Sequence, residues 1–527
     1  MTLPNFERKP LYAPRGAVAT SQPLAAAAGL AVLRSGGNTV DAAIAAAVTL
    51  TVVQPASNQV GSDLFALVWD GERLHGLNGS GRAPAALTAA RVRRGGHRTM
   101  PQRGWLPVTV PGAPRAWRDL HERFGRLPFE DLFGDAIEYA DRGFPVSPTA
   151  AHYWQAGISA STALSGPEFE GFLPMYAPGG HAPAAGQTWR SADLAETLRR
   201  IAATGSEDLY SGKTAEQITA FAAHTGGLLS DADLAEHTST WVAPITASYR
   251  GYEVWELPPN GQGLAALVAL NILGGFDMPA YESAERYHLQ IEATKLALAD
   301  AHRYIADPDH AAVPIAGLLA PDYARRRRAL IGPRALVPEP GEPDRGGTVY
   351  LCAADSDGAM VSLIQSNYLG FGAHVVVPGT GVSLQCRGAG FSLDDAHPGC
   401  LAPGKRPYHT IIPGFLARDG MPVGPFGIMG GHMQPQGHVQ LISNTVDYGM
   451  DAQAALDAPR WYWAQGRRVH VEPRVPAAVR AALGERGHEI TTDGAVDLVG
   501  CGQAIWRQAG GYVAGTEARA DGCAIGY

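Results

Sequence analysis

Residues 332–347 divide the sequence into two parts of different character, and this break limits the possible folds more than any other feature. The segment, GPRALVPEPGEPDRGG, holds four Pro and four Gly in sixteen positions. It cannot form a helix or a central strand, because Pro lacks a backbone N–H and Gly weakens both structures. We therefore expect a long exposed loop. Taken alone, the loop is most simply explained as a linker between two domains.

The patterns on the two sides of the break differ. Before it, two Ala-rich stretches, PLAAAAGLAVLRS and DAAIAAAVTLTVV, predict helices capped by Ser21 and Thr39, and helical patterns dominate from about residue 110 to 335. After it, TVYLCAAD and AMVSLIQS predict a hairpin that turns at residues 356–358, and a helix is expected over 434–446. This order predicts either two domains or one α+β sheet sandwich to which both parts contribute.

Composition excludes several classes of protein. Hydrophobic residues make up 46% of the chain and charged residues 17%, which is too apolar for a disordered chain. A net charge of −8 without a basic stripe argues against a nucleic-acid partner. The start, MTLPNFERKP, resembles no signal peptide, and no apolar run reaches the length of a membrane span, so we expect no membrane partner. The five Cys show no C-x-x-C spacing, which predicts neither a disulfide framework nor a zinc site and favours a cytoplasmic protein.

Thr348 is a candidate nucleophile because of its position. It follows the last Gly of the loop, Gly347, and opens the first strand beyond it. A Thr hydroxyl needs a base beside it, and a Thr that becomes a chain N-terminus can use its own α-amine. That role requires cleavage between Gly347 and Thr348. The alternative is a β-branched residue that simply opens a strand, and local sequence alone favours this alternative.

Gly430 and Gly431 form a second candidate element, ahead of the predicted helix at 434–446. Unobstructed backbone N–H groups at such a point can hold a developing oxyanion, although a turn that requires Gly explains the same residues. No phosphate-loop, G-x-S-x-G or H-E-x-x-H motif is present, and the 17 His are scattered. We therefore predict no cofactor and no metal.

Several stretches together resemble the γ-glutamyltransferase (glutathione hydrolase) family of N-terminal-nucleophile hydrolases. They include PLAAAAGLAVLRSGGNTVDAAIAAA, GGLLSDADLAEHTSTWVAPITASYRGYEVWELPP, GTVYLCAADSDGAMVSLIQSNYLGFG, PGKRPYHTIIP, MGGHMQPQGHVQLISNTVDYG and ADGCAIGY. They span essentially the whole chain in family order. The resemblance implies a four-layer αββα sandwich made as a proenzyme and cut into two chains. Residues 1–347 and 348–527 would then be the large and small chains, intertwined in one domain rather than forming two.

The resemblance also implies roles for individual residues. Thr348 occupies the nucleophile position, and Ser366 stands where the family usually has a second Thr that supports the nucleophile. Arg82 matches an Arg that binds the substrate α-carboxylate, a task that suits a bidentate guanidinium. Gly430 and Gly431 match the family's oxyanion pair.

The sequence departs from the family in the region that would bind a glutamyl group. Gly390 stands where glutamyl-specific members have an Asp for the substrate α-ammonium, and His409-Thr410 replaces their Ser-Ser pair. Arg387 would add a second positive charge close by. The small chain would begin Thr-Val-Tyr instead of the usual Thr-Thr-His. We therefore expect an intact nucleophile beside an altered substrate pocket, in which Arg82, Arg387 and Thr410 are candidate substrate-binding residues.

The resulting hypothesis is a self-processing Thr amidohydrolase or acyltransferase. It would act on a small-molecule amide or γ-glutamyl substrate and pass the acyl group to water or an amino-group acceptor. One alternative is an amidohydrolase for another carboxylate-bearing amide, of the oxamate or cephalosporin/glutaryl type. The other is an unprocessed, inactive relative that only binds small acids.

Overall fold

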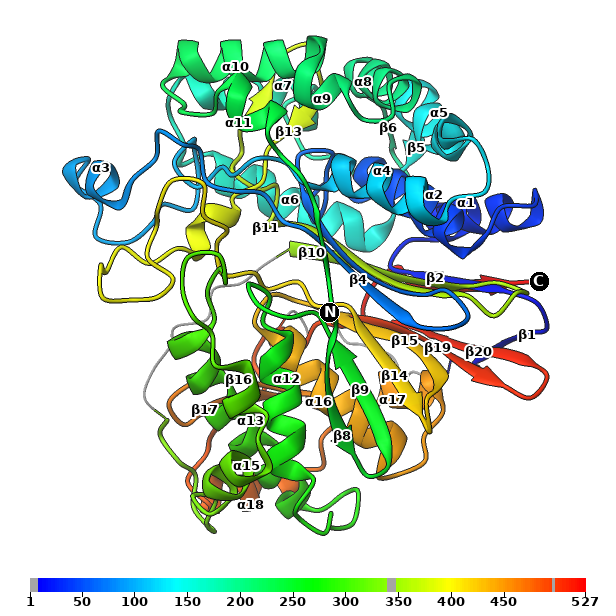
Figure 1. Cartoon of the computed structure of the whole chain (residues 1–527), viewed down its shortest axis with the longest axis vertical. Coiled ribbons are helices and arrows are strands. Elements are labelled where there is room, and N and C mark those ends of the chain that lie inside the picture. The colour runs from blue at the N-terminus through cyan, green and yellow to red at the C-terminus, as the bar shows by residue number, and fades with distance from the viewer. Residues whose placement is uncertain (1–7, 339–346, 495–497) are drawn as a thin grey trace.

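Two large sheets face each other at the centre of the molecule, and helices cover the outer face of each sheet (Figure 1). The computed structural model describes residues 8–338, 347–494 and 498–527. Both large sheets contain seven strands in the described part of the chain. The predicted α+β class and the αββα order of layers are therefore confirmed.

The upper sheet of Figure 1 is antiparallel and contains the strand that starts beside the Pro/Gly loop. In spatial order its strands are β21 (Cys523–Gly526), β2 (Ala17–Thr20), β10 (Gly347–Ala354), β11 (Met360–Tyr368), β3 (Asp63–Trp69), β4 (Leu74–Gly79) and β7 (Thr240–Val242). The predicted hairpin is β10–β11, in which Leu351 pairs with Leu363.

The lower sheet is also antiparallel and leads to the second glycine element. In spatial order its strands are β1 (Leu11–Ala13), β20 (Gly511–Thr516), β19 (Cys501–Gln508), β15 (Met421–Met429), β14 (Gly414–Arg418), β9 (Tyr252–Glu256) and β8 (Ile245–Tyr249). The inward faces of the two sheets share one apolar core, which includes Phe65 and Ile364 of the upper sheet and Phe415 and Ile505 of the lower. This core fixes the two sheets relative to each other.

Neither large sheet belongs to one side of the Pro/Gly loop. In the upper sheet, β10 and β11 lie between β2 and β3, which come from the first part of the chain. In the lower sheet, β9 and β8 from the first part extend a sheet whose centre comes from the second part. The two parts of the chain are thus interleaved, as a single sandwich requires.

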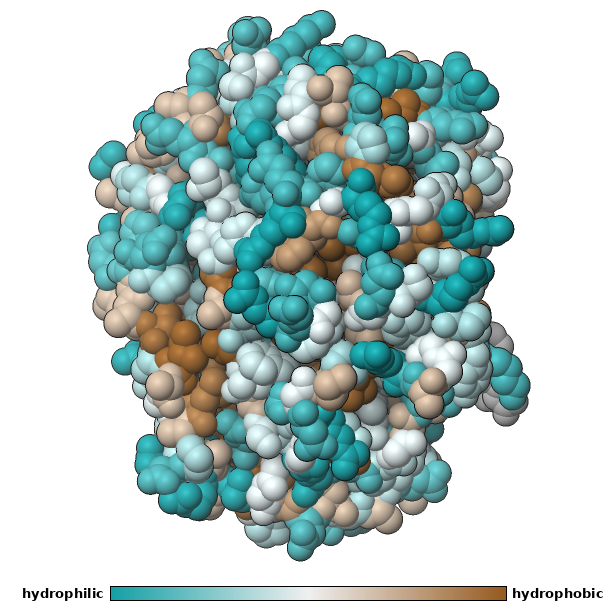
Figure 2. All heavy atoms as spheres, turned by 45° about the vertical axis from the view of Figure 1, so that its right-hand side comes forward, coloured by the Kyte–Doolittle hydropathy of each residue, from teal (hydrophilic) through white to brown (hydrophobic). Residues whose placement is uncertain are grey.

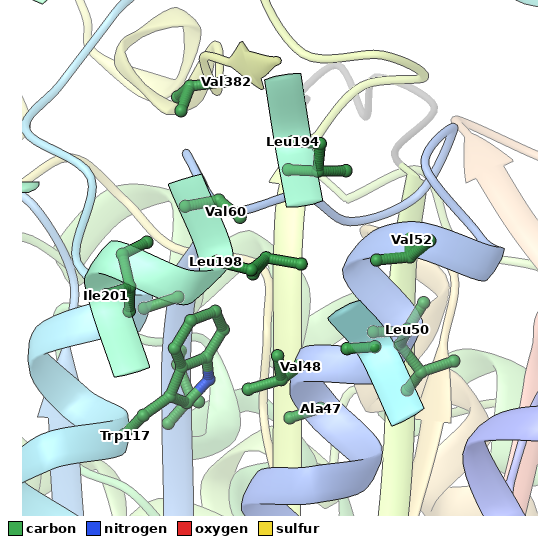
Figure 3. Close-up of a cluster of buried hydrophobic side chains, with 14 of the residues drawn as sticks. Ala47, Val48, Leu50, Val52, Val60, Trp117, Leu194, Leu198, Ile201 and Val382 are labelled. Atoms are coloured by element: carbon green, nitrogen blue, oxygen red, sulfur yellow. The ribbon is translucent and has the colours of Figure 1, made fainter. Parts of the chain in front are cut away.

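Helices of the first part of the chain cover the upper sheet (Figure 1). All 15 residues of α2 are buried, which explains why its apolar residues surround the helix instead of forming one stripe. Figure 3 shows side chains of α2 packed with Trp117 and with Leu198 and Ile201. The main helices of this layer are α1 (Pro23–Arg34), α2 (Thr39–Val53), α4 (Ala113–Phe124), α5 (Gly134–Arg142), α6 (Pro148–Ser161), α8 (Ala192–Ala203) and α10 (Lys213–Thr225).

Helices from both parts of the chain cover the lower sheet. They are α12 (Gly263–Leu273), α13 (Ala284–Tyr304), α15 (Pro321–Arg328), α16 (Met433–Val446), α17 (Ala452–Asp457) and α18 (Ala477–Glu485). The helix predicted over 434–446 is α16. Three short strands beside them form a small sheet of their own: β16 (Trp461–Gln465), β17 (Arg468–Val471) and β18 (Glu489–Thr491).

The two predicted N-terminal caps are wrong by one residue. Gln22, not Ser21, caps α1 by accepting from the N–H groups of Leu24 and Ala25. Asn38, not Thr39, caps α2 and forms a capping box with Asp41. In both helices the cap is the amide side chain next to the predicted residue, one position later in α1 and one position earlier in α2, where its oxygen reaches the first free N–H groups.

The face of the molecule in Figure 2 is mostly hydrophilic, with smaller groups of apolar residues between the polar ones. Among the described residues, no helix combines the length and the apolar character needed to cross a membrane. All five Cys are unpaired thiols.

Candidate active site

Thr348 lies in an irregular part of the upper sheet, at the second position of β10. The register between β10 and β11 shifts between Gly347 and Val349, and such a bulge changes the direction of the side chain it contains. Thr348 is only 4% exposed, and its Oγ1 lies 3.1 Å from Oγ of Ser366 on β11. The structure therefore brings the predicted nucleophile and the predicted supporting hydroxyl into contact.

Ser366 accepts hydrogen bonds from two donors besides its contact with Thr348. Its Oγ accepts from the backbone N–H of Tyr368 at 2.9 Å and from Nη2 of Arg387 at 3.0 Å. Either hydroxyl can be the donor in the contact between Ser366 and Thr348, and one of the two directions runs from Ser366 to Thr348 Oγ1. A hydrogen bond in that direction stabilises negative charge on the Thr348 oxygen as it attacks.

Arg387 lies beneath this pair of hydroxyls, fully buried. Its Nη1 donates to Oγ1 of Thr410 at 2.7 Å, and its guanidinium lies 4.3 Å from the centre of the Tyr368 ring. No carboxylate among the described residues lies within ion-pair distance of it. Arg387 therefore places a positive charge under the nucleophile that is balanced mainly by hydroxyls and a ring.

Burial shapes the ionisation of the groups around Arg387. It lowers the pKa of Arg387 to about 10, against the opposing attraction of Asp63, so the guanidinium stays charged at neutral pH. It raises the pKa of Asp63 to about 6, although Arg387 and a hydrogen bond from Gln385 oppose the rise. Burial also lowers the pKa of His409, whose Nε2 lies 3.0 Å from Asp63 Oδ2. A neutral His409 can thus donate to Asp63 and hold it in place.

Gly430 and Gly431 connect β15 to α16 in a conformation that favours glycine. Their φ angles are 137° and 62°. Neither backbone N–H donates a hydrogen bond to any of the described residues, whereas the Gly431 carbonyl accepts from Gln262 Nε2 at 2.9 Å. Two free N–H groups next to each other can stabilise an oxyanion.

A cavity of about 360 Å³ opens at Thr348, a size suited to a small-molecule ligand. Gly430 lines it together with Thr348, so the candidate nucleophile and one candidate oxyanion donor face the same space. The rest of the lining comes from the loop after α2, from one face of α6, and from Arg103, Gly370, Met429, Gly500, Cys501 and Ala520.

The loop that follows β11 forms part of this wall and is backbone-strained. Tyr368, Phe371 and His374 all have positive φ angles, of 75°, 58° and 59°, which residues other than Gly rarely adopt. Their side chains are buried, so packing holds the loop in this shape. Such strain concentrates at functional sites. Sequence analysis did not single out this loop as part of the site, although Gly370 and Gly372 lie within it.

The residues predicted to bind the substrate do not line the cavity. Arg82 donates to Asp309 Oδ2 at 3.1 Å and lies 3.7 Å from Asp307 Oδ2. Thr410 accepts from Arg387, and Arg387 is buried below Ser366. At Gly390, a Cβ atom would lie 2.7 Å from the backbone oxygen of Tyr408, so a side chain there requires a shift of the backbone. Substrate binding by Arg82, Arg387 and Thr410 stays a prediction.

One cluster away from the cavity has the residue types of a metal site. The possible ligand atoms of His288, Glu292 and His488 lie within 4.8 Å of one another. However, Lys295 Nζ lies 2.7 Å from Glu292, and His288 Nδ1 lies 2.9 Å from His488 Nε2. The ammonium balances the carboxylate and the two rings pair with each other, so all the candidate ligand atoms except His488 Nδ1 already have hydrogen-bond partners among the described residues.

Comparison with known proteins supports the relationship expected from the motifs. The γ-glutamyltranspeptidase family model matches residues 25–527. A glutathione hydrolase-like proenzyme of Bacillus subtilis is 35% identical, over 95% of this chain and 97% of its own. An oxamate amidohydrolase proenzyme of Klebsiella pneumoniae is also 35% identical, over 96% of this chain and 97% of its own. The crystal structure of a cephalosporin acylase from Bacillus halodurans superposes with a TM-score of 0.97 at 51% identity, covering 100% of this chain and 98% of the other.

A four-layer sandwich with a hydroxyl nucleophile candidate at the start of a central strand is the architecture of an N-terminal-nucleophile hydrolase. The chain belongs to the γ-glutamyltranspeptidase family. It is a hydrolase of that family, as the sequence predicted.

Proposed function

We propose that this protein is a proenzyme that cuts itself between Gly347 and Thr348 and then hydrolyses amides with the new N-terminal Thr. The observation that carries the proposal is the shared cavity. Thr348, which is hydrogen-bonded to Ser366, lines the same cavity as Gly430. The backbone N–H of Gly430 donates to none of the described residues. The names of the two relatives, both proenzymes, support the processing step.

Self-cleavage follows from the position of Thr348. Its Oγ attacks the carbonyl carbon of Gly347, the C–N bond to Thr348 breaks, and the freed nitrogen takes the proton. Water then hydrolyses the resulting ester, which leaves a carboxylate on Gly347 and a free α-amine on Thr348. The large chain, 1–347, and the small chain, 348–527, stay together because each contributes hydrogen-bonded strands to both large sheets.

In the mature enzyme, the α-amine of Thr348 takes the proton of its own hydroxyl as Oγ attacks the substrate amide. The N–H groups of Gly430 and Gly431 stabilise the tetrahedral oxyanion, and the proton passes to the leaving amine. The acyl group on Thr348 is then transferred to water or to an amino-group acceptor. Ser366, polarised by Arg387, supports the attacking oxygen.

Substitution of Thr348 tests this proposal directly. Thr348→Ala removes the nucleophile, so the chain should remain a single band on a denaturing gel and lack amidase activity. Thr348→Ser keeps a hydroxyl and should retain some cleavage and some activity. Efficient cleavage or turnover by folded Thr348→Ala would overturn the proposal.

The oxyanion role has a separate test. A Val at position 431 would strain a backbone with φ of 62° and displace the N–H donors. Loss of one such donor costs about 10²- to 10³-fold in rate. Gly431→Val should therefore fold but turn over slowly, with circular dichroism as the control for folding. Near-full activity in the folded variant would show that Gly430 and Gly431 only form a turn and do not stabilise the oxyanion.

A further inference from the structure

Arg103 stands apart from the other residues that line the cavity at Thr348. Among the described residues, it is the one Lys or Arg that lines the cavity, and no Asp or Glu of this part of the chain lines it. The lining is otherwise formed by uncharged side chains, His152 and backbone. A half-buried cation at a largely apolar wall favours an anionic occupant, because an opposite charge compensates its partial desolvation better than neutral groups do.

Among the described residues, the hydrogen-bond acceptors of Arg103 are two backbone carbonyls and, at 3.8 Å, the Sγ of Cys386. Its Nη1 donates to the carbonyl oxygens of Gly372 at 2.8 Å and Gln102 at 3.3 Å, which are neutral acceptors. No carboxylate among the residues with described positions lies within ion-pair distance of its guanidinium. Arg82 differs in this respect, since it lies against Asp307 and Asp309.

The contact with Gly372 also positions Arg103. Gly372 belongs to the strained loop after β11, and Gly370 of the same loop lines the cavity. A guanidinium anchored through one nitrogen keeps the remaining N–H groups for a ligand, and a carboxylate is the ligand that fits such a fork. Arg103 is therefore a fixed anion-binding group on the wall of the catalytic cavity.

The helix opposite is shaped for an apolar chain. Thr149, His152, Tyr153, Ala156, Gly157 and Ala160 line the cavity from α6. These positions recur at intervals of three and four residues, so they form one face of the helix. Ala156, Gly157 and Ala160 have little or no side chain, which leaves room for methylene groups beside them.

Resting on the proposed function, we infer that Arg103 binds a distal carboxylate on the acyl group of the substrate. The substrate class is then amides of dicarboxylic acids, whose methylene chain lies along α6 while the amide carbonyl reaches Thr348. This assignment differs from the pocket expected from the motifs, where Arg82 would bind an α-carboxylate. No acid of the described residues lines the cavity, which also disfavours an α-ammonium on the substrate.

A matched pair of substrates tests the inference. Glutaryl and valeryl 4-nitroanilides have the same number of acyl carbons, and only the first carries a distal carboxylate. The unmodified protein should show a higher kcat/KM for the glutaryl compound. Arg103→Met should reduce that value by about 10- to 150-fold, the worth of a charged hydrogen bond, and leave the valeryl value nearly unchanged. Arg103→Lys should retain part of the preference.

The control variant is Arg94→Met, at an exposed Arg at the end of the short helix α3 (Ala89–Arg94). It removes the same charge from the surface and should change neither value. An unchanged glutaryl-to-valeryl ratio in folded Arg103→Met would overturn the inference, as would a preference of the unmodified protein for the valeryl compound.

A binding measurement separates this inference from the proposed function. Calorimetry with glutarate and valerate needs no turnover, so it remains informative even if the protein hydrolyses neither anilide. The unmodified protein should bind glutarate more tightly than valerate, and Arg103→Met should lose that difference. Equal affinity for the two acids in the unmodified protein would contradict the role of Arg103, whatever the amidase activity.

Discussion

Two buried arginines in this molecule have different partners: Arg519 contacts carboxylates, whereas Arg387 contacts neutral groups. Arg519 lies between two carboxylates, with Nη2 2.6 Å from Glu472 Oε2 and Nη1 2.7 Å from Glu517 Oε1. Arg387 is just as deeply buried but contacts the hydroxyls of Ser366 and Thr410. One guanidinium is fully compensated by opposite charge, and the other is not.

The pKa shifts follow from this difference. The two carboxylates raise the pKa of Arg519 further above its usual value, whereas burial lowers the pKa of Arg387 to about 10. Ions that neutralise each other hold elements together and have no charge left for a ligand or a reacting atom. A buried cation without an acid partner has a field that acts on its neutral neighbours, here the hydroxyl that contacts Thr348. The comparison therefore separates a structural charge cluster from a functional one.

The largest expected effect is a loss of stability at Arg519, the paired site, where the guanidinium contacts two carboxylates. Arg519→Met breaks the ion pairs of Arg519 with Glu472 and Glu517, which keep Arg474 and Arg460 respectively as their other partners. Breaking a buried ion pair typically costs about 3–5 kcal/mol, so the free energy of unfolding should fall by about that amount. Denaturant titration measures it. A loss below about 1 kcal/mol would mean that the cluster is not a structural centre.

The paired site should also give a pH dependence of stability. The flanking arginines hold the pKa of Glu517 at about 2, below an ordinary value of 4.5, despite its burial. Its ionisation thus stabilises the fold above pH 4.5, on the order of 3 kcal/mol, and this contribution is lost as the pH falls toward 2. The gap in unfolding free energy between the unmodified protein and Glu517→Gln should be full at pH 6 and shrink between pH 4.5 and 3. A gap that is constant with pH would contradict the assignment.

Substitution by Met at Arg387, the unpaired site, should affect turnover and not reduce stability. Arg387→Met removes a buried charge without orphaning any carboxylate in direct contact, so the free energy of unfolding should stay the same or rise. Turnover should fall by about 10- to 150-fold, because Ser366 loses a charged donor. Parallel denaturation and steady-state assays of Arg387→Met and Arg519→Met make the comparison. Equal stability losses at the two sites would remove the distinction between them.

The smallest effect is expected at the hydroxyl between Arg387 and Thr348. Ser366→Ala deletes the contact with Thr348 together with the hydrogen bonds that Ser366 accepts from Tyr368 and Arg387. The direct contact with the nucleophile is a neutral hydrogen bond, worth about 0.5–1.5 kcal/mol, which corresponds to roughly a 2- to 10-fold loss of rate. Ser366→Thr retains the hydroxyl and should recover most of it. The measurement is kcat for one amide substrate with all three proteins. If both variants match the unmodified protein, the hydroxyl does not transmit the influence of Arg387.

Much of the fold could be predicted because its signals are local. The Pro/Gly segment ends directly before Thr348, the β10–β11 hairpin has turn residues at 356–358, and α2 is apolar on every side. The helix caps were missed by one residue because Ser, Thr, Asn and Gln can all serve, and only the backbone geometry selects among them.

The catalytic candidates could be predicted from local sequence motifs, whereas the proposed substrate-binding Arg103 could not. Thr348, Ser366, Gly430 and Gly431 stand in motifs that sequence alone identifies. Arg103 stands in TMPQRGWLP, which carries no motif, and it reaches the cavity only through the folded loop after β11. Sequence patterns likewise give no sign that Arg82 is paired with Asp309, because the partners are 227 positions apart.

The central claim is that Thr348 becomes a chain N-terminus and serves as the nucleophile. Intact-mass and N-terminal sequencing of the active protein test it most directly. The account predicts two fragments, of residues 1–347 and 348–527, with the smaller one beginning Thr-Val-Tyr-Leu. A single full-length chain with full amidase activity, or a small fragment that begins at another residue, would contradict it.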